Sequence, residues 1–376
     1  MTKHILIDGT PVSRRMDGLS QYILNVVSRL SQRADTHYTI VLRPGECPDG
    51  YVTKWQGRGI EVCFASIAPI GPGREWQFRR WLRSRPAFDA ALIPSNQYPL
   101  FLPIPSVYIV HDLIYERYPA QLGRWAHAKR RWLHGNVAQG LRKATRVVAV
   151  SAFTRDEIIR CHPAITAGKI TVVHEGWEHL QRPASDLAAP VPYTDYILYV
   201  GSSRGHKNLQ GLLDAMTIAQ PYMNVGQGLV ITGDDRWLNK SQRAQIAALN
   251  GKVVTTGWLT SAQLDACYRQ AKAVVFPSLS EGFGIPVLEA FYYGKPLLVS
   301  KAASFPEVAG EAALYFNPVK PTEIAEKLIQ ALAMTEEERQ QWADRGAQRL
   351  NTFSWQKTAD EIETILQEIC PIKNIK

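Results

Sequence analysis

The chain has 376 residues, which is more than one hydrophobic core usually serves, so we expect two domains. It contains 43 Lys and Arg against 34 Asp and Glu, a formal net charge of +9 at pH 7. No run of about 18 apolar residues occurs, which excludes a membrane-spanning helix. The five cysteines have no C-x-x-C spacing, so they favour reduced packing residues over a zinc site or a disulfide framework.

The positive charge is concentrated in the first half of the chain. Residues 1–185 contain 25 basic and 14 acidic residues, a net charge of +11, while residues 186–376 contain 18 and 20, a net charge of −2. The N-terminus leads directly into an apolar β-type run and offers no signal segment. We therefore expect a cytoplasmic protein that is soluble or peripheral on the inner face of the cytoplasmic membrane.

Short β-branched runs alternate with helical patterns from the N-terminus onward, which is typical of parallel sheets with crossover helices. Strands are predicted at 5–7, 38–42, 90–93, 107–110 and 147–150, with helices at 21–33 and 124–141. A Pro- and Ala-rich stretch at 183–192 is predicted to be a linker. A second set of strands follows at 196–200, 228–232, 252–255, 273–276 and 296–299.

The expected fold class is α/β, with two doubly wound, Rossmann-like domains facing each other across a cleft. We assign residues 1–182 to the first domain and 193–355 to the second. Ligands bind such sheets at the carboxyl ends of the strands, so the chemistry is expected in the loops there.

The most informative of these loops is Ser278-Leu-Ser-Glu-Gly-Phe-Gly-Ile-Pro-Val-Leu-Glu-Ala290. Gly282 and Gly284 let the backbone approach a ligand, and Pro286 suits the first position of a helix. The amides of residues 283–285 would then face an anion such as a diphosphate. Glu281 and Glu289 would accept hydrogen bonds from sugar hydroxyls.

This segment resembles the Glu, seven residues, Glu signature of retaining nucleotide-sugar glycosyltransferases of the GT-B fold, family 4. The likeness extends over nearly the whole chain. Residues 199–208 resemble the family's glycine loop ending in Lys-Asn, and residues 302–313 resemble a later loop. The Arg236-Trp237 loop and the Lys-Asn pair resemble bacterial mannosyl- and rhamnosyltransferases of surface polysaccharides and O-antigen, which favours GDP-mannose as the donor. In similar enzymes a terminal helix, here 356–376, packs back on the first domain.

The resemblance implies roles for individual residues. The catalytic candidates are His111, Lys207 and Glu281. Donor-binding candidates are Gly18, Ser202, Arg204, Lys207, Trp258, Leu259, Glu281, Phe283, Gly284, Ile285 and Glu289. Acceptor-binding candidates are Gly18, Tyr22, His111 and Asp112. Ser202 stands where many relatives carry an arginine, so Arg204 and His206 are the available cations for a second positive contact.

The expected reaction replaces a nucleoside diphosphate by an acceptor hydroxyl with retention at the anomeric carbon. Retaining glycosidases hold two carboxylates about 5 Å apart. Glu281 and Glu289 should instead bind separate hydroxyls, so neither is interpreted as a nucleophile. The family expectation is a front-face displacement, in which Lys207 and the helix amides stabilise the leaving group. Since Gly233-Asp234-Asp235 is not an Asp-x-Asp pair, no metal and no further cofactor are predicted.

Two segments of the basic half mix cations with tryptophan, at 74–85 and 124–132. This composition favours docking on an anionic membrane surface, beside a lipid-linked glycan acceptor. The alternative is a solvated basic face whose tryptophans turn into the core.

Two other functions remain open. A nucleotide-sugar epimerase would share the fold, and a non-catalytic two-lobed sugar-binding protein would share the architecture. A nucleic-acid reader would need a recognisable binding module, and none is visible, so nucleic acid is not predicted as a partner.

Overall fold

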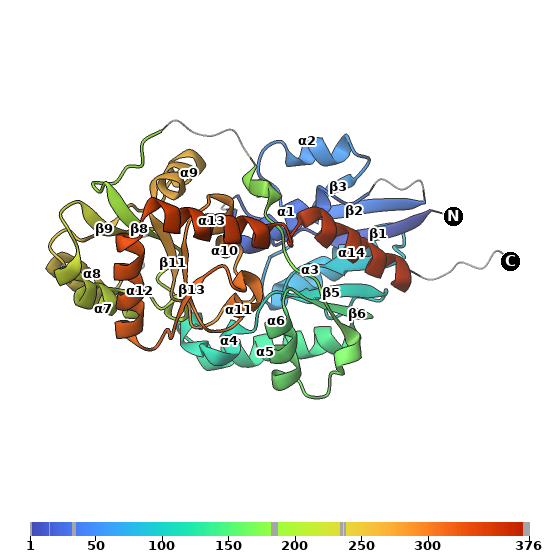
Figure 1. Ribbon diagram of the computed structural model, residues 1–376. Helices are drawn as coiled ribbons and strands as arrows, with labels where there is room; N and C mark the ends of the chain where they lie inside the picture. Colours follow the sequence, from blue (N-terminus) through green and yellow to red (C-terminus); the bar gives the residue numbers. More distant parts are fainter. Residues whose placement is uncertain are drawn as a thin grey trace. The chain divides into compact units, whose positions relative to one another are not determined.

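The computed structural model describes residues 2–14, 16–31, 35–181, 187–233, 236 and 238–370. The chain forms two compact units, one made of residues 1–176 and 354–376 and the other of residues 177–353 (Figure 1). The predicted domain bounds are therefore shifted. Residues 177–181, which were predicted in the first domain, belong with the second unit, and residues 354–355, which were predicted in the second, belong with the first. Of the predicted linker, residues 183–186 lie outside the described residues.

The first unit contains a parallel sheet of seven described strands in the order β3-β2-β1-β4-β5-β6-β7. The strands are β1 (Lys3–Asp8), β2 (Thr36–Leu42), β3 (Glu61–Phe64), β4 (Ala90–Ile93), β5 (Ser106–Val110), β6 (Arg146–Ala149) and β7 (Ile170–Val172). The helices are α1 (Gly18–Val27), α2 (Tyr51–Gln56), α3 (Pro72–Arg83), α4 (Ile114–Arg117), α5 (Ala126–Lys143), α6 (Ala152–Cys161) and α14 (Trp355–Ile369), with 3₁₀ turns η1 (Pro119–Leu122) and η2 (Ala167–Lys169). The central strand β4 is apolar and buried along its whole length, as is expected of a parallel strand whose two faces are both covered.

The terminal helix α14 completes the core of the first unit. It contacts α1, β4 and β5, and it buries Trp355, Ile362 and Leu366 completely. Glu363 on the same helix accepts hydrogen bonds from the Ser31 hydroxyl at 2.5 Å and the Tyr38 hydroxyl at 3.2 Å. The last 15 residues of regular structure are therefore an integral part of this unit.

The second unit contains a parallel sheet of six described strands in the order β10-β9-β8-β11-β12-β13. The strands are β8 (Asp195–Val200), β9 (Gln227–Thr232), β10 (Val253–Thr255), β11 (Ala273–Phe276), β12 (Leu297–Ser300) and β13 (Leu314–Phe316). The helices are α7 (Leu209–Ala219), α8 (Lys240–Ala248), α9 (Ser261–Gln270), α10 (Ile285–Tyr292), α11 (Phe305–Ala309), α12 (Pro321–Ala333) and α13 (Glu336–Leu350), with 3₁₀ turns η3 (Glu178–Leu180), η4 (Gly205–Lys207) and η5 (Gln220–Tyr222). The expected α/β class with two Rossmann-like domains is confirmed.

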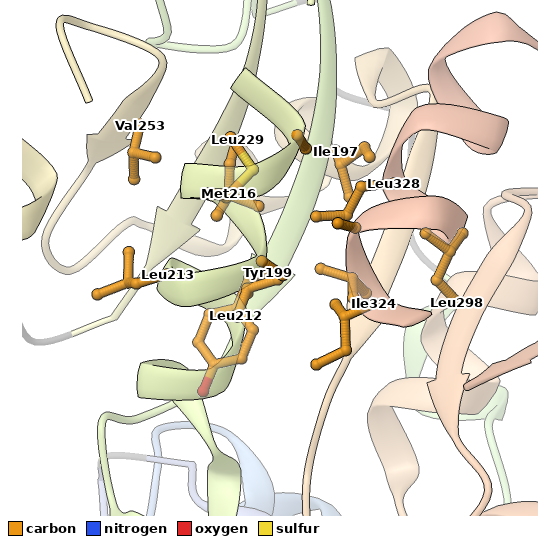
Figure 2. Close-up of a cluster of buried hydrophobic side chains, with 14 of the residues drawn as sticks. Ile197, Tyr199, Leu212, Leu213, Met216, Leu229, Val253, Leu298, Ile324 and Leu328 are labelled. Carbon is orange, nitrogen blue, oxygen red and sulfur yellow. The ribbon is translucent and has the colours of Figure 1, made fainter. Parts of the chain in front are cut away.

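The core of the second unit forms where α7 packs on the sheet and on α12 (Figure 2). Leu209, Leu212, Leu213 and Met216 lie at helical spacing, so they form one apolar face of α7. Figure 2 shows Leu212, Leu213 and Met216 of this face gathered in one cluster with the strand residues Ile197 and Leu229 and the α12 residues Ile324 and Leu328. All of these side chains are at most 2% exposed. The packing fixes the start of α7, which directly follows the Lys-Asn pair.

Two predicted helix positions are corrected by the structure. The first helix begins at Gly18, three residues before the predicted start, because the Asp17 carboxylate accepts the Ser20 amide at 2.8 Å and caps it. It ends at Val27, and residues 32–34 of its predicted end lie outside the described residues. Helix α10 begins at Ile285, so Pro286 occupies the second helical position.

Candidate functional site

In both sheets the strand order reverses direction once, between β1 and β4 and between β8 and β11. Crevices at the carboxyl ends of the strands beside such a switch point are the usual ligand sites of doubly wound folds. In the second unit, the loop after β8 contains Lys207 and the loop after β11 contains Glu281. The two residues therefore flank the switch point.

Hydrogen bonds tie these two loops together. The Leu279 amide donates to the His206 carbonyl at 2.7 Å, and the Asn208 side chain donates to the Pro277 carbonyl at 3.1 Å. Asn208 itself has a left-handed backbone, with φ of 55°, which asparagine tolerates better than most residues. The result is an ion pair of 2.7 Å between Lys207 Nζ and Glu281 Oε1, with side chains 24% and 12% exposed.

The 302–313 segment supports the loop that contains Glu281. The buried Ser304 hydroxyl donates to the carbonyls of Phe283 at 2.8 Å and Glu281 at 3.1 Å. Gly284 has φ of 103°, and a Cβ there would lie 2.9 Å from the Phe305 ring. Only glycine fits this position without strain. The 302–313 segment thus fixes the path by which the backbone enters α10.

Helix α10 presents its N-terminus at this loop, and its first amides have no acceptors within the helix. Phe283 just before it is buried, and its ring packs edge-on against Phe353 at 5.6 Å. Glu289 lies one turn into the helix, where its Oε2 accepts the Tyr268 hydroxyl at 2.5 Å. Burial, together with the negative charge of Glu289, raises the pKa of Tyr268 well above its usual value, so the phenol stays a donor. A helix end of this kind can bind an anion, and Glu289 holds a positioned carboxylate beside it.

One of the two candidates for a second positive contact is removed by the structure. His206 is only 4% exposed, and burial lowers its pKa to about 4, so its side chain is neutral at pH 7. Arg204 is exposed, in the same loop. Ser202 is held by its carbonyl, which accepts the Tyr199 hydroxyl at 2.7 Å. Arg204 is therefore the remaining candidate in this loop for a second positive contact beside Lys207.

The loop after β10 contributes an exposed aromatic ring. Trp258 is 62% exposed, so it is not a core residue, and Leu259 beside it is half-buried. The preceding Gly257 has a left-handed backbone, and its carbonyl accepts the Gly233 amide at 3.1 Å. A small hollow of about 10 Å³ lies near these loops, lined by Gly201, Ser203, Leu209, Ile231, Thr232, Gly233, Leu238 and Thr255.

In the first unit, His111 directly follows β5 and is held on both sides of its ring. Its Nε2 lies 3.2 Å from the Pro94 carbonyl, and its Nδ1 lies 3.4 Å from a carboxylate oxygen of Glu175. The Tyr22 ring packs against the imidazole at 4.7 Å, edge to face. The His111 side chain remains 16% exposed. These contacts fix the orientation of the ring and leave part of its edge accessible.

The other first-unit candidates have different surroundings. Tyr22 is fully buried, and its hydroxyl has no hydrogen-bond partner among the described residues, so direct contact with an acceptor would require it to leave this packing. Gly18 is exposed with open space around it, at the start of α1. The Asp112 carboxylate accepts the Ile114 amide at 3.1 Å and thereby shapes the turn after His111.

Three residues that support the site were missed by the sequence analysis. Glu175 positions His111, Ser304 holds the Glu281 loop, and Tyr268 holds Glu289. Glu175 follows β7, so recognising Ile170–Val172 as a strand would have placed it at a carboxyl edge. Ser304 lies within a segment that the sequence analysis did single out. Tyr268 lies on a helix with no local signal for this contact.

Two kinds of feature are absent among the described residues. No group of three or more His, Cys, Asp and Glu side chains among them has the arrangement of a metal site. Asp234, Asp235 and Trp237 of the loops discussed from sequence lie outside this set. None of the helices described is both long enough and apolar enough to cross a bilayer.

Comparison with known proteins identifies both halves of the chain. Residues 16–178 match the family model "Glycosyltransferase Family 4", and residues 191–349 match "Glycosyl transferases group 1". A curated relative, O-antigen chain mannosyltransferase B of Escherichia coli, is 30% identical over 60% of this chain and 61% of its own. O-antigen chain mannosyltransferase RfbU of Salmonella typhimurium is 28% identical over 47% of this chain and 48% of its own. The matched regions thus span about three fifths of the relatives' length or less.

Among solved structures, Anabaena Alr3699/HepE in complex with UDP and glucose superimposes with a TM-score of 0.73. The alignment covers 98% of this chain and all of that one, at 17% sequence identity, so it supports the fold. The two family models together cover most of the described sequence, each on one Rossmann-like unit. The chain belongs to the glycosyltransferases of the GT-B fold, with a family 4 domain followed by a group 1 domain.

Proposed function

We propose that this protein is a retaining hexosyltransferase that moves a hexose from a nucleoside-diphosphate sugar to a glycan or lipid-linked glycan hydroxyl in bacterial surface polysaccharide synthesis. The observation that carries the proposal is the pairing of Lys207 and Glu281 at the switch point, beside the N-terminus of α10. A cation and a helix end suit a diphosphate, and the carboxylates of Glu281 and Glu289 suit sugar hydroxyls. GDP-mannose is the proposed donor, because both curated relatives described above are named mannosyltransferases.

In the proposed reaction, the acceptor hydroxyl attacks the anomeric carbon from the face that the diphosphate leaves, the bond from that carbon to the diphosphate breaks, and the departing phosphate oxygen takes the hydroxyl proton. Lys207 and the α10 amides stabilise the negative charge that develops on the leaving oxygen, and Arg204 adds a second cation. Glu281 and Glu289 orient the hexose, and His111 with Asp112 and Gly18 orients the reacting hydroxyls. In this proposal no metal ion takes part, because Lys207, Arg204 and the α10 amides supply the positive charge and the donors that face the diphosphate.

Two measurements test this function. In a thermal-shift screen of nucleotide sugars, we expect GDP-mannose to raise the melting temperature most, since binding to the folded state stabilises it by mass action. Release of nucleoside diphosphate should then depend on added glycan acceptor and persist in the presence of EDTA. Acceptor-independent hydrolysis or epimerisation of the donor would contradict transfer and favour an epimerase.

The Tyr268–Glu289 hydrogen bond offers a specific prediction about donor affinity. We expect Glu289→Ala to weaken binding of the donor by roughly tenfold or more, since a carboxylate–hydroxyl hydrogen bond contributes about 1.5 kcal/mol or more. Tyr268→Phe removes only the group that positions the carboxylate, so a smaller rise in KM with little change in kcat is expected. Titration calorimetry with the donor provides the measurement, and Tyr315→Phe, whose hydroxyl bonds the Gly310 carbonyl, provides the control. Equal affinity in Glu289→Ala and wild type would refute the assignment.

We also propose that the first unit docks on an anionic membrane through a surface we call the α3 surface, made of Trp76, Arg79, Arg80, Phe101 and Lys143. Trp76 is 64% exposed and Phe101 is 58% exposed. The guanidinium of Arg80 lies 5.4 Å from the Trp76 ring, and the cations of Arg79 and Lys143 lie 5.0 and 5.9 Å from the Phe101 ring. Exposed aromatic rings flanked by cations suit a lipid headgroup layer.

The tryptophans of the two basic segments divide between surface and core. Trp81 is 9% exposed and packs on Phe78 and Phe88, so the alternative of an inward-facing ring holds for it. Trp125 is 71% exposed, as is expected of a residue that meets a membrane or solvent. The proposed contact therefore rests on Trp76 and Phe101.

We expect Arg79→Gln/Arg80→Gln to reduce co-sedimentation with phosphatidylglycerol vesicles by roughly tenfold or more, because each cation near an anionic surface contributes about 1 kcal/mol. Phosphatidylcholine vesicles should bind neither the wild-type protein nor this variant appreciably. Arg345→Gln is a matched control, since Arg345 also stacks on a tryptophan, Trp342, in the second unit. Binding that is independent of anionic lipid, or equal loss in the control, would remove the membrane proposal.

A further inference from the structure

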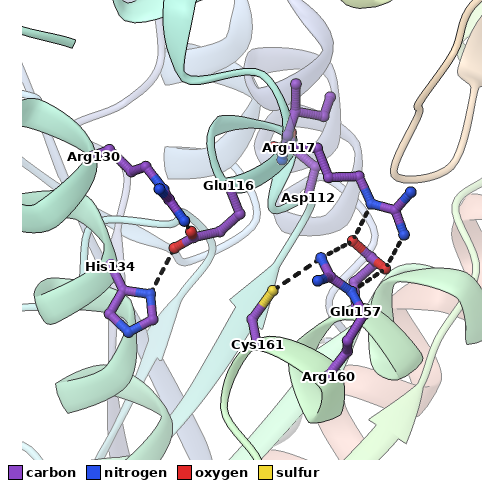
Figure 3. Close-up of polar contacts among 9 residues, drawn as sticks. Asp112, Glu116, Arg117, Arg130, His134, Glu157, Arg160 and Cys161 are labelled. Carbon is purple, nitrogen blue, oxygen red and sulfur yellow. Dashed lines mark hydrogen bonds and ion pairs between the residues drawn. The ribbon is translucent and has the colours of Figure 1, made fainter. Parts of the chain in front are cut away.

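The first unit contains a charged pocket whose residues are not part of the candidate site. It has a volume of about 560 Å³. Its lining residues come from α4, α5 and α6, and they are Glu116, Arg117, Arg130, His134, Arg160 and Cys161. Figure 3 shows these side chains in two groups, one around Glu116 and one around Glu157.

Buried carboxylates hold the cations of each group in place. Glu157 is 8% exposed, and each of its oxygens accepts from both Arg117 and Arg160, over distances of 2.7–3.0 Å. Burial by itself would raise the pKa of Glu157, but the hydrogen bonds from the two guanidinium groups outweigh it and lower the pKa to about 2. Glu116 is 6% exposed and accepts from Arg130 at 2.9 Å, and its other oxygen lies 2.6 Å from His134 Nδ1. Glu157 therefore stays ionised, and both oxygens of each carboxylate have partners.

The cations retain donors for a ligand. Arg117, Arg130, His134 and Arg160 are 43–53% exposed at their side chains. Among the described residues, the carboxylate contacts of Arg117 and Arg160 use Nε and Nη2, which leaves Nη1 of each without a partner. Three arginines against two glutamates give the group a net positive charge before His134 is counted. Planar guanidinium groups with spare N–H donors suit a phosphoryl group.

The pocket is close to His111 along the fold. The Thr154 hydroxyl at the start of α6 donates to the His111 carbonyl at 3.2 Å. Arg160 lies six residues further along the same helix, or about 9 Å at the rise of an α-helix. Helix α4, which contains Arg117, begins three residues after His111. A ligand held in the pocket would therefore have its next groups within reach of His111.

We infer that this pocket binds a phosphoryl or diphosphoryl group of the glycan acceptor. The assignment of this group to an acceptor rests on the proposed function, whereas the anion site itself does not. The group can come from a soluble glycosyl phosphate or from the diphosphate of a lipid-linked glycan, since both present the same oxygens to the arginines. The lipid-linked source would also join this pocket to a membrane-bound substrate.

The first experiment measures binding without turnover. Calorimetry with inorganic pyrophosphate is done on full-length Lys207→Ala protein, in which anion binding at the donor loops is weakened. Adding Arg130→Gln and Arg160→Gln should reduce the remaining affinity by roughly tenfold or more, since each hydrogen bond between charged groups is worth about 1.5 kcal/mol or more. Arg130→Gln leaves Glu116 paired with His134, and Arg160→Gln leaves Glu157 paired with Arg117. Adding Arg155→Gln instead, an exposed arginine on α6 that pairs with Asp156, should change nothing.

The second experiment assigns the ligand to the acceptor. In otherwise wild-type protein, Arg130→Gln/Arg160→Gln should raise KM roughly tenfold for a phosphorylated acceptor and leave KM unchanged for the same glycan without phosphate. Soluble and detergent-solubilised lipid-linked acceptors form separate arms, and the arm that shows the difference identifies the source. Undiminished pyrophosphate binding overturns the site, and equal KM changes with both acceptors overturn the acceptor assignment. Absence of transfer with every acceptor would refute the proposed function while the binding experiment still decides the pocket.

Discussion

Lys207→Ala is expected to lower kcat by roughly 10²–10³, which is the usual effect of removing one group that stabilises charge in the transition state. The ammonium follows the charge that grows on the departing oxygen, so its loss should affect turnover more than donor affinity. The side chain is well placed for this role, since its loop is anchored to the loop after β11 and its Nζ lies 2.7 Å from Glu281. Steady-state kinetics with the donor identified by thermal shift provides the measurement.

Two further variants make the Lys207 result specific. Lys207→Arg keeps the charge on a larger planar group, so part of the activity should return. Lys327→Ala removes a lysine on α12 whose one hydrogen bond within the described part of the chain is to Gln330, and it should behave as wild type. Turnover of Lys207→Ala equal to that of the control would show that the leaving group is stabilised elsewhere.

Gly176→Ala is expected to destabilise the first unit by about 3 kcal/mol or more. A Cβ at this position would lie 2.0 Å from the Trp355 amide nitrogen and 2.4 Å from the Ser354 carbonyl carbon. These are backbone atoms at the start of α14, and the Trp355 side chain is fully buried. Neither the backbone nor the ring can therefore move without disrupting the surrounding packing. Differential scanning calorimetry should show a lower melting temperature, with loss of the packing around Trp355 and Tyr22.

Gly135→Ala is the matched control for this result. Gly135 lies inside α5 with no atom within 4 Å of a Cβ position, so alanine should be neutral or stabilise the helix by about 0.5–1 kcal/mol. A Gly176→Ala protein that melts like wild type would show that the chain at 354–355 can shift without cost.

The long, β-branched central strands could be predicted from sequence, and all ten predicted strands occur. The three missed strands, Glu61–Phe64, Ile170–Val172 and Leu314–Phe316, are short and lie at the sheet edges. An edge strand pairs on one side only, so it needs fewer residues of strong β propensity and leaves a weaker pattern. Two of them have three residues, which is too short to show an alternation.

In the candidate site, too, some residues have a local signal in the sequence and others have none. The Gly-x-Gly loop and the Lys-Asn pair carry local signals, because tight turns and helix starts need particular residues. The Lys207–Glu281 ion pair joins residues 74 positions apart, and the His111–Glu175 contact joins residues 64 apart, so neither has a local signature. The burial of His206 could not be seen either, since histidine in a polar loop gives no sign of the packing around it.

The contribution of α14 to the first unit has a consequence during synthesis. On the ribosome, residues 177–353 emerge as one continuous segment that contains the whole second unit, whereas the earlier-made residues 1–176 lack the helix that packs on α1 until residues 355–369 have been made. The usual order, in which the N-terminal domain matures first, is therefore reversed for the final packing step. A nascent chain stalled before residue 355 would expose the apolar surface that Trp355, Ile362 and Leu366 cover, which makes it a natural client for chaperones.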